Sequence, residues 1–145
     1  MIRAYIDGGA RGNPGPAGFG VRIEDAEGTL LAELHQALGV ATNNVAEYQG
    51  LLAALQYAVE HDHRVVHVRS DSLLLVKQMQ GEYKVKNEGL KPLVVRARLL
   101  IMELDDVTFE HVRREANAEA DRLANLAMDE AESQPPGTQR PAPSV

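Results

Sequence analysis

The spacing of the apolar residues changes near residue 44, and this change limits the possible folds more than any other feature of the sequence. Before it, apolar and polar residues alternate in three short segments. Alternation of this kind predicts strands with one buried face. Because short links join the three segments, we expect an antiparallel meander. The alternating apolar residues are Ile2, Ala4 and Ile6, then Phe19, Val21 and Ile23, then Leu30, Ala32 and Leu34.

After residue 44 the apolar residues recur at helical spacing up to Val59. A short apolar run at residues 65–68 then predicts a buried strand that ends near Asp71. Two helices, a last strand and a final helix are predicted over residues 72–81, 91–104, 107–111 and 117–128. A strand–helix–strand order implies parallel pairing with a right-handed crossover. The predicted class is therefore α/β, with a mixed five-stranded sheet, an antiparallel meander plus two parallel strands, flanked by helices.

Composition is consistent with one domain, which we expect to occupy residues 1–130 of the 145. Residues 131–145 are polar and contain four prolines, so a disordered tail is expected there. No apolar run approaches the roughly 20 residues of a membrane span, and the first residues do not resemble a signal peptide. The absence of cysteine excludes disulfides and thiolate metal sites. We therefore expect a cytoplasmic protein with no membrane partner and no obligate protein partner.

The net charge of −6 counts mildly against a nucleic-acid partner, because such binding depends on neutralising phosphates. The distribution of charge matters more than its sum. Between residues 77 and 98, six basic side chains stand against only two acidic ones, Glu82 and Glu88. This basic stretch is a candidate surface for phosphates; its basic residues are Lys77, Lys84, Lys86, Lys91, Arg96 and Arg98.

Four acidic residues occupy positions where carboxylates could meet. Asp7 and Asp71 each follow a predicted strand, and ligand sites in open sheets form at such strand ends. Two adjacent carboxylates repel each other unless they are protonated or bridged by a cation, and Mg²⁺ prefers oxygen ligands. Asp121 flanks the apolar stripe of the last helix and should face the sheet. Glu47 lies in the first turns of its helix.

Each acid also has an ordinary structural explanation. Asp7 and Asp71 could simply form turns at strand ends. Glu47 lies three residues after Asn44, the spacing of a capping box in which Asn44 would cap the helix. Asp121 could favour the dipole of its helix. Taken singly, none of these residues establishes a catalytic site.

Three further features of the sequence give weaker indications. The glycine-rich segment over residues 8–16 lacks the Lys-Ser or Lys-Thr of a phosphate-binding P-loop, so it is interpreted as a wide hairpin loop with positive φ at some glycines. His61 and His63 lie in a polar turn at a helix end, which does not favour a metal pair. Tyr83 is an aromatic within the basic stretch and gives weak support for base stacking.

Taken together, these motifs resemble those of the ribonuclease HI family. The segments that match are Asp7-Gly8-Gly9 with residues 12–18, Thr42-Asn43-Asn44-Val45-Ala46-Glu47, Ser70-Asp71-Ser72, and residues 117–124 from Asn117 to Ala124. Their order and spacing agree with the family over about residues 1–130, so the resemblance implies a ribonuclease H-like fold.

The resemblance also implies an enzyme that hydrolyses the RNA strand of RNA–DNA hybrids and leaves 5′-phosphate and 3′-hydroxyl ends. Two divalent cations, Mg²⁺ or Mn²⁺, would be held by Asp7, Glu47, Asp71 and Asp121. By analogy Asp7 would bridge both ions, Asp121 would help hold the ion that activates water, and Glu47 and Asp71 would hold the ion at the leaving oxygen. The family positions that contact the hybrid near the ribose 2′-hydroxyls match Asn13, Asn43 and Asn44.

Two departures from the family pattern define a branch. The loop before the fourth motif, residues 112–116, holds arginines and no histidine, and His111 comes earlier, at a strand end. Arg114 is the candidate substitute. No lysine- and tryptophan-rich handle follows residue 80, which leaves Lys84 and Lys86 as candidate hybrid contacts. The alternatives are a catalytically silent module that binds hybrid or duplex RNA on the same fold, and another nuclease of the wider superfamily.

Overall fold

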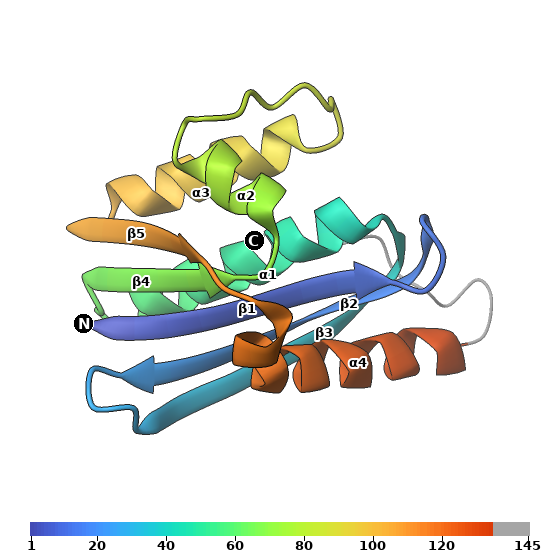
Figure 1. Ribbon diagram of the computed structural model, residues 1–145, viewed down its shortest axis with the longest axis horizontal. Helices are drawn as coiled ribbons and strands as arrows, with labels where there is room; N and C mark the ends of the chain where they lie inside the picture. The colour runs from blue at the N-terminus through green and yellow to red at the C-terminus, as the bar shows by residue number, and fades with distance from the viewer. Residues whose placement is uncertain (135–145) are drawn as a thin grey trace.

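The computed structural model describes residues 1–134 and shows an α/β fold built on one five-stranded sheet (Figure 1). Strands β1, β2 and β3 pair antiparallel, and β4 pairs parallel with both β1 and β5. The order across the sheet is β3-β2-β1-β4-β5, which confirms the predicted meander with two parallel strands. The strands are β1 (Ile2–Ala10), β2 (Gly15–Asp25), β3 (Leu30–Ala41), β4 (Val65–Ser70) and β5 (Asp106–His111).

Helices cover the two faces of the sheet unequally (Figure 1). On one face α1 packs against β1 and β2 and is itself covered by α3. On the other face α4 packs against β2, β3 and β1 but does not extend over β5. The helices are α1 (Asn43–Glu60), α2 (Leu73–Met79), α3 (Lys91–Met102), the short 3₁₀ helix η1 (Arg114–Asn117) and α4 (Ala118–Ser133).

The main hydrophobic core lies between the sheet and the α1–α3 layer. Alternate residues of β1 and β4 point into it, as the predicted alternation requires. The inner face of α1 supplies the opposing side chains. Fully buried members of this core include Ile2, Ala4, Ile6, Val21, Ile23, Leu51, Leu52, Leu55, Val66 and Val68.

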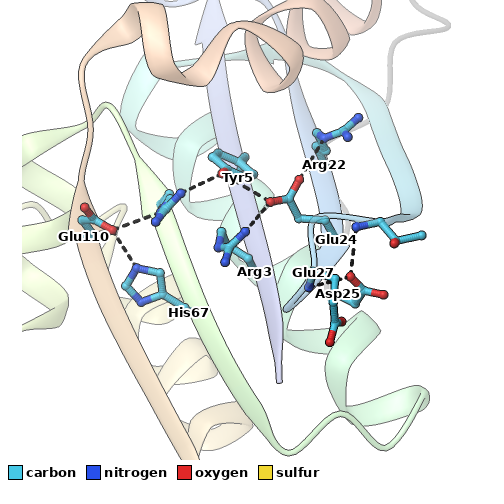
Figure 2. Close-up of polar contacts among 10 residues, drawn as sticks. Arg3, Tyr5, Arg22, Glu24, Asp25, Glu27, His67 and Glu110 are labelled. Carbon is cyan, nitrogen blue, oxygen red and sulfur yellow. Dashed lines mark hydrogen bonds and ion pairs between the residues drawn. The ribbon is translucent and has the colours of Figure 1, made fainter.

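The face of the sheet that α4 leaves open carries paired charges in place of a second apolar layer (Figure 2). Glu24 forms ion pairs with Arg3 at 2.6 Å and with Arg22 at 3.4 Å. Glu110 on β5 likewise pairs with two neighbours on β4, His67 and Arg69. The predicted buried fourth strand is therefore buried on one face only, since every second residue of β4 points toward this polar surface.

Two element boundaries also differ from the sequence prediction. The glycine-rich loop expected over residues 8–16 shrinks to residues 11–14, because β1 continues to Ala10 and β2 begins at Gly15. Gly12 in the turn has a φ of 94°, so the expectation of positive φ is confirmed there. The final helix runs on to Ser133 with Ala131 buried, so a tail that starts at residue 131 is wrong by three residues. Residues 135–145 of the expected tail lie outside the described residues.

The helix prediction missed this last turn because Asp129, Glu130 and Glu132 make its sequence look solvated. Ala127 and Ala131 nevertheless continue the apolar stripe at a spacing of four residues and stay buried against the sheet. None of the helices described in residues 1–134 is long and apolar enough to cross a membrane.

Candidate active site

The register of the parallel strands brings Asp7 and Asp71 together. The pairing of β1 with β4 ends at Ile6 opposite Ser70, and the residue that follows each of these two is an aspartate. Both lie where the sheet changes from antiparallel to parallel connections, on the carboxyl side of β4. Asp7 also accepts a hydrogen bond from the backbone N–H of Gly8 at 2.9 Å. The predicted meeting of these two carboxylates is confirmed.

Glu47 reaches the same place because α1 starts close to β1. Thr42 caps α1, with its hydroxyl accepting from the Val45 N–H at 3.2 Å. The predicted capping role for Asn44 and Glu47 is therefore wrong, since with Thr42 as cap Glu47 lies beyond the third helical position. A Cβ at Gly8 would overlap the backbone of Ala46 and Glu47, so the glycine allows the close approach that places Glu47 beside Asp7.

A second close approach brings Asp121 in from the other face of the sheet. Gly18 and Gly20 of β2 lie directly under α4, where a Cβ at Gly20 would come within 2.5 Å of backbone atoms of Ala120 and Ala124. Gly20 is the register partner of Asp7. Asp121, one residue after Ala120, is therefore held next to Asp7.

A groove with a volume of about 600 Å³ collects these side chains. All four predicted acids line it, and they come from four different elements or links. The start of α1 and the middle of α4 form its two sides, and the end of β1 forms its floor. Its lining residues are Asp7, Gly8, Gly9, Ala10, Arg11, Asn43, Glu47, Asp71, Arg114, Asp121, Asn125 and Met128.

Burial raises the pKa of three acids in this groove, Asp7, Glu47 and Asp71. Burial, then the charges of Asp71 and Asp121, raise the pKa of Asp7 to about 8. Burial is also the main reason that the pKa of Glu47 rises to about 7, while a hydrogen bond with Ser72 partly offsets it. Burial raises the pKa of Asp71 as well, against the lowering effect of Arg114. The four carboxyl groups outnumber the two arginines that line the groove. A bound cation would offset the remaining negative charge and favour the ionised carboxylates.

The donor set fits hard divalent cations. The groove offers carboxylate oxygens with no thiolate or imidazole among its lining residues, and Mg²⁺ binds proteins through one or two carboxylates, retaining waters and substrate phosphates. Within residues 1–134, no group of three or more acidic, histidine or cysteine side chains is arranged so that it could hold a metal ion by itself. An ion in this groove would therefore need further ligands, such as water and a substrate phosphate.

Asn13 and Asn43 lock the β1–β2 turn to the start of α1. The Asn43 N–H donates to Asn13 Oδ1 at 3.1 Å, and the Ala10 N–H donates to Asn43 Oδ1 at 2.7 Å. Asn43 lines the groove, and Asn13 lies beside it on the exposed turn. Asn44, the third predicted contact, is half-buried and does not line the groove.

The predicted basic contacts separate into two groups. Arg114 lines the groove, with Nε 3.9 Å from Asp71 Oδ2, and its side chain is 82% exposed. Lys84 and Lys86 are exposed on the connection between α2 and α3 and do not line the groove. His111 is held at the end of β5, where a ring nitrogen lies 3.2 Å from the Asp71 carbonyl oxygen.

Sequence reasoning missed the outer end of the groove. Arg11 forms ion pairs with Asp129 at 2.6 Å and Glu132 at 2.9 Å, and it donates to Asn125 Oδ1 at 3.1 Å. These contacts fasten the β1–β2 turn to α4. A signal was present in the sequence, since Asn125, Asp129 and Glu132 follow Asp121 at helical spacing, but nothing in it paired that stripe with Arg11.

Comparison with known proteins gives the family. Residues 5–127 match the family described as reverse transcriptase-like. The bifunctional protein Rv2228c of Mycobacterium tuberculosis is 51% identical over 126 residues, which cover 86% of this chain and only 35% of that protein. The chain thus spans about a third of the length of this relative.

Solved structures agree with the family match. The N-terminal RNase H domain of Rv2228c is 48% identical, with a TM-score of 0.88 over 90% of this chain and 95% of that chain. RNase H1 of the archaeon Halobacterium salinarum is 42% identical, with a TM-score of 0.85 over 89% and 98%. LC11-RNase H1, solved in complex with an RNA/DNA hybrid, is 46% identical, with a TM-score of 0.87 over 92% and 100%. The chain therefore belongs to the reverse transcriptase-like family and has the ribonuclease H fold.

Proposed function

We propose that this protein is a ribonuclease H, an endonuclease that hydrolyses the RNA strand of RNA–DNA hybrids and leaves 5′-phosphate and 3′-hydroxyl ends. The observation that carries the proposal is the convergence of Asp7, Glu47, Asp71 and Asp121 in one open groove beside Arg114. The relative solved with an RNA/DNA hybrid supports the choice of substrate.

The four carboxylates are assigned as ligands of two divalent cations, Mg²⁺ or Mn²⁺. When bound, such ions supply activation of the attacking water and neutralisation of charge on the leaving oxygen. Asp7 would be the shared ligand, because the charges of both Asp71 and Asp121 act on it. Asp121 would help Asp7 to hold one ion, and Glu47 and Asp71 would help it to hold the other.

Arg114 and Asn43 in the groove, with Asn13 beside it, hold and select the substrate. Arg114 is placed to contact the phosphate near Asp71, and because arginine stays protonated it acts by charge and does not carry a proton. The Oδ1 atoms of Asn13 and Asn43 are occupied by backbone N–H groups, which leaves the Nδ2 groups as donors toward the ribose of the RNA strand. The 2′-hydroxyl is the group that distinguishes RNA from DNA at such a site.

A cleavage assay on end-labelled substrates tests the proposal. With Mg²⁺ or Mn²⁺ the protein is expected to cut the RNA strand of a hybrid and to leave duplex DNA intact, and chelation of the metal should stop cleavage. Binding of hybrid without cleavage under either metal would instead support a catalytically silent module. Cleavage of duplex DNA with equal efficiency would indicate another nuclease of the superfamily.

A further inference from the structure

Asn117 is a buried polar residue at the start of α4 that the proposed chemistry does not use. It is only 1% exposed, and its Nδ2 donates to the Ile6 carbonyl oxygen at 2.8 Å. The Oδ1 of the same amide is buried without a hydrogen-bond partner in the part of the chain described, residues 1–134. An unsatisfied buried acceptor destabilises the fold. The favourable contribution of this amide must therefore come from the hydrogen bond that its Nδ2 group donates.

The acceptor of that hydrogen bond lies directly before the central acid. The Ile6 carbonyl belongs to the peptide group whose nitrogen is that of Asp7. Ile6 is also the last residue of β1 that pairs with β4, so beyond it the sheet supports the backbone from the β2 side only. Asn117 therefore holds β1 at the point where Asp7 leaves the parallel part of the sheet.

The same residue fixes the start of the helix that carries Asp121. Asn117 joins η1 to α4, and Asp121 lies about one helical turn further on. Asn125 in turn donates from Nδ2 to the Asp121 carbonyl oxygen at 2.9 Å, within the regular helix. One side-chain amide thus connects the backbone at Asp7 to the helix that presents Asp121.

We propose that Asn117 is a positioning residue for the divalent-cation site. Its hydrogen bond would hold Asp7 and Asp121 at a separation that allows both to bind one ion. The inference rests on the proposed function in taking these two acids as ligands. Groups that orient metal ligands typically contribute about 10–100-fold in metal affinity. An effect on ion binding, beyond any effect on folding, is therefore expected.

The test is direct measurement of Mn²⁺ binding by calorimetry in the absence of hybrid. Asn117→Ala and Asn117→Leu are expected to raise the Mn²⁺ dissociation constant about tenfold. Leu123→Ala is the matched control, because Leu123 is a buried residue of the same helix but has no polar side-chain group that could bond to the Ile6 carbonyl. The control should lose thermal stability yet bind Mn²⁺ like wild type. Wild-type affinity in the Asn117 variants, or an equal loss in Leu123→Ala, overturns the proposal.

A measurement on the wild-type protein covers the case in which the Asn117 variants do not fold. If the hydrogen bond favours ion binding, ion binding must strengthen the hydrogen bond by the same factor. Solvent exchange of the Asn117 side-chain N–H groups, followed by NMR, should slow when Mg²⁺ is added. Unchanged exchange at saturating Mg²⁺ counts against the proposal. Neither experiment uses hybrid, so a failure of wild type to cleave hybrid would overturn only the proposed function.

Discussion

At Asp7, burial and neighbouring charge shift the pKa in the same direction. The side chain is shielded from water and faces Asp71 and Asp121, which together raise its pKa to about 8. Glu47 is raised to about 7, again chiefly by burial. A bound divalent cation reverses these effects, because an opposite charge favours the ionised carboxylate. Folding, pH and ion binding are therefore coupled at the level of single residues.

The variant Asp7→Asn tests this coupling. The folded-state pKa of Asp7 lies above its ordinary value of 3.8, so the unfolded chain releases a proton that the folded chain keeps. Stability from this group is therefore present at low pH and is lost as pH rises from about 4 to about 8. In metal-free buffer at pH 8, Asp7→Asn is expected to melt a few degrees above wild type, a gain of roughly 1 kcal/mol or more.

The same variant should lack hybrid cleavage, since the amide loses the charge that a shared ligand needs. Melting curves from pH 4 to pH 9 and a cleavage assay check both parts. The difference in melting temperature should shrink toward pH 4 and should reverse when Mg²⁺ is added. Near wild-type cleavage by Asp7→Asn would remove Asp7 from the metal-binding set.

Arg114 and Arg113 provide a paired test of the loop before α4. Arg114 lines the groove next to Asp71, whereas Arg113 does not line it. Arg114→Ala is therefore expected to lower kcat by about 10-fold or more with a smaller change in KM, as for loss of a contact made mainly in the transition state. Arg113→Ala should have little effect on kcat. Steady-state kinetics on a labelled hybrid decides, and equal effects of the two substitutions would show that only general positive charge matters.

At the scale of elements, the sequence predicted what depends on periodicity and chain order. The spacing from Tyr48 to Val59 predicted α1, and the strand order predicted that Asp7 and Asp71 meet. Helix-to-sheet distance was not predictable, because it depends on which glycines lie under which helix. Gly8 under α1 and Gly20 under α4 set that distance on the two faces, and a sequence pattern cannot assign these pairings.

Substitution of the two neighbouring glycines of β1, Gly8 and Gly9, distinguishes the effect of close packing against a helix from the general effect of replacing a glycine. A Cβ at Gly8 would overlap the backbone of α1, whereas a Cβ at Gly9 would make ordinary contacts with the Met128 side chain at 3.5 Å and with Asn43 Oδ1 at 3.8 Å. Gly8→Ala is expected to cost about 1–3 kcal/mol of stability through overpacking and to impair cleavage by displacing Glu47. Gly9→Ala should be close to neutral in stability. Denaturant unfolding measures both, and similar costs would mean that α1 can shift to accept the methyl group.

At the scale of the whole molecule, the structure sets Lys84 and Lys86 apart from the other residues of the basic stretch. The excess of four positive charges already subtracts Glu82 and Glu88, which pair with Lys77 at 3.2 Å and with Lys91 at 2.7 Å. Of the other basic residues, Arg98 donates to the Gln78 carbonyl oxygen at 3.4 Å. Lys84 and Lys86 form no ion pair within residues 1–134 and flank Val85, which packs against the core. Both ammonium groups therefore remain available to phosphates on a chain whose net charge is −6.

This arrangement predicts weak hybrid binding with a shallow dependence on salt, because the slope scales with the number of phosphates neutralised. Changing Lys84 and Lys86 together to alanine should raise KM and reduce the slope of log KM against log salt by at most about two units. The value of kcat should change little, since contacts outside the groove contribute binding that is equal in ground and transition states.

The matched control changes Lys77 and Lys91 together to alanine. It removes the same formal charge from the same stretch, but from lysines that already form ion pairs with glutamates. If Lys84 and Lys86 touch phosphates, only their double variant should flatten the slope, because counterion release requires a local contact. Equal flattening in both variants would mean that the long-range field of the protein, and not this loop, attracts the hybrid. An unchanged slope in both would place the phosphate contacts on another surface, for which the exposed Arg114 is the first candidate.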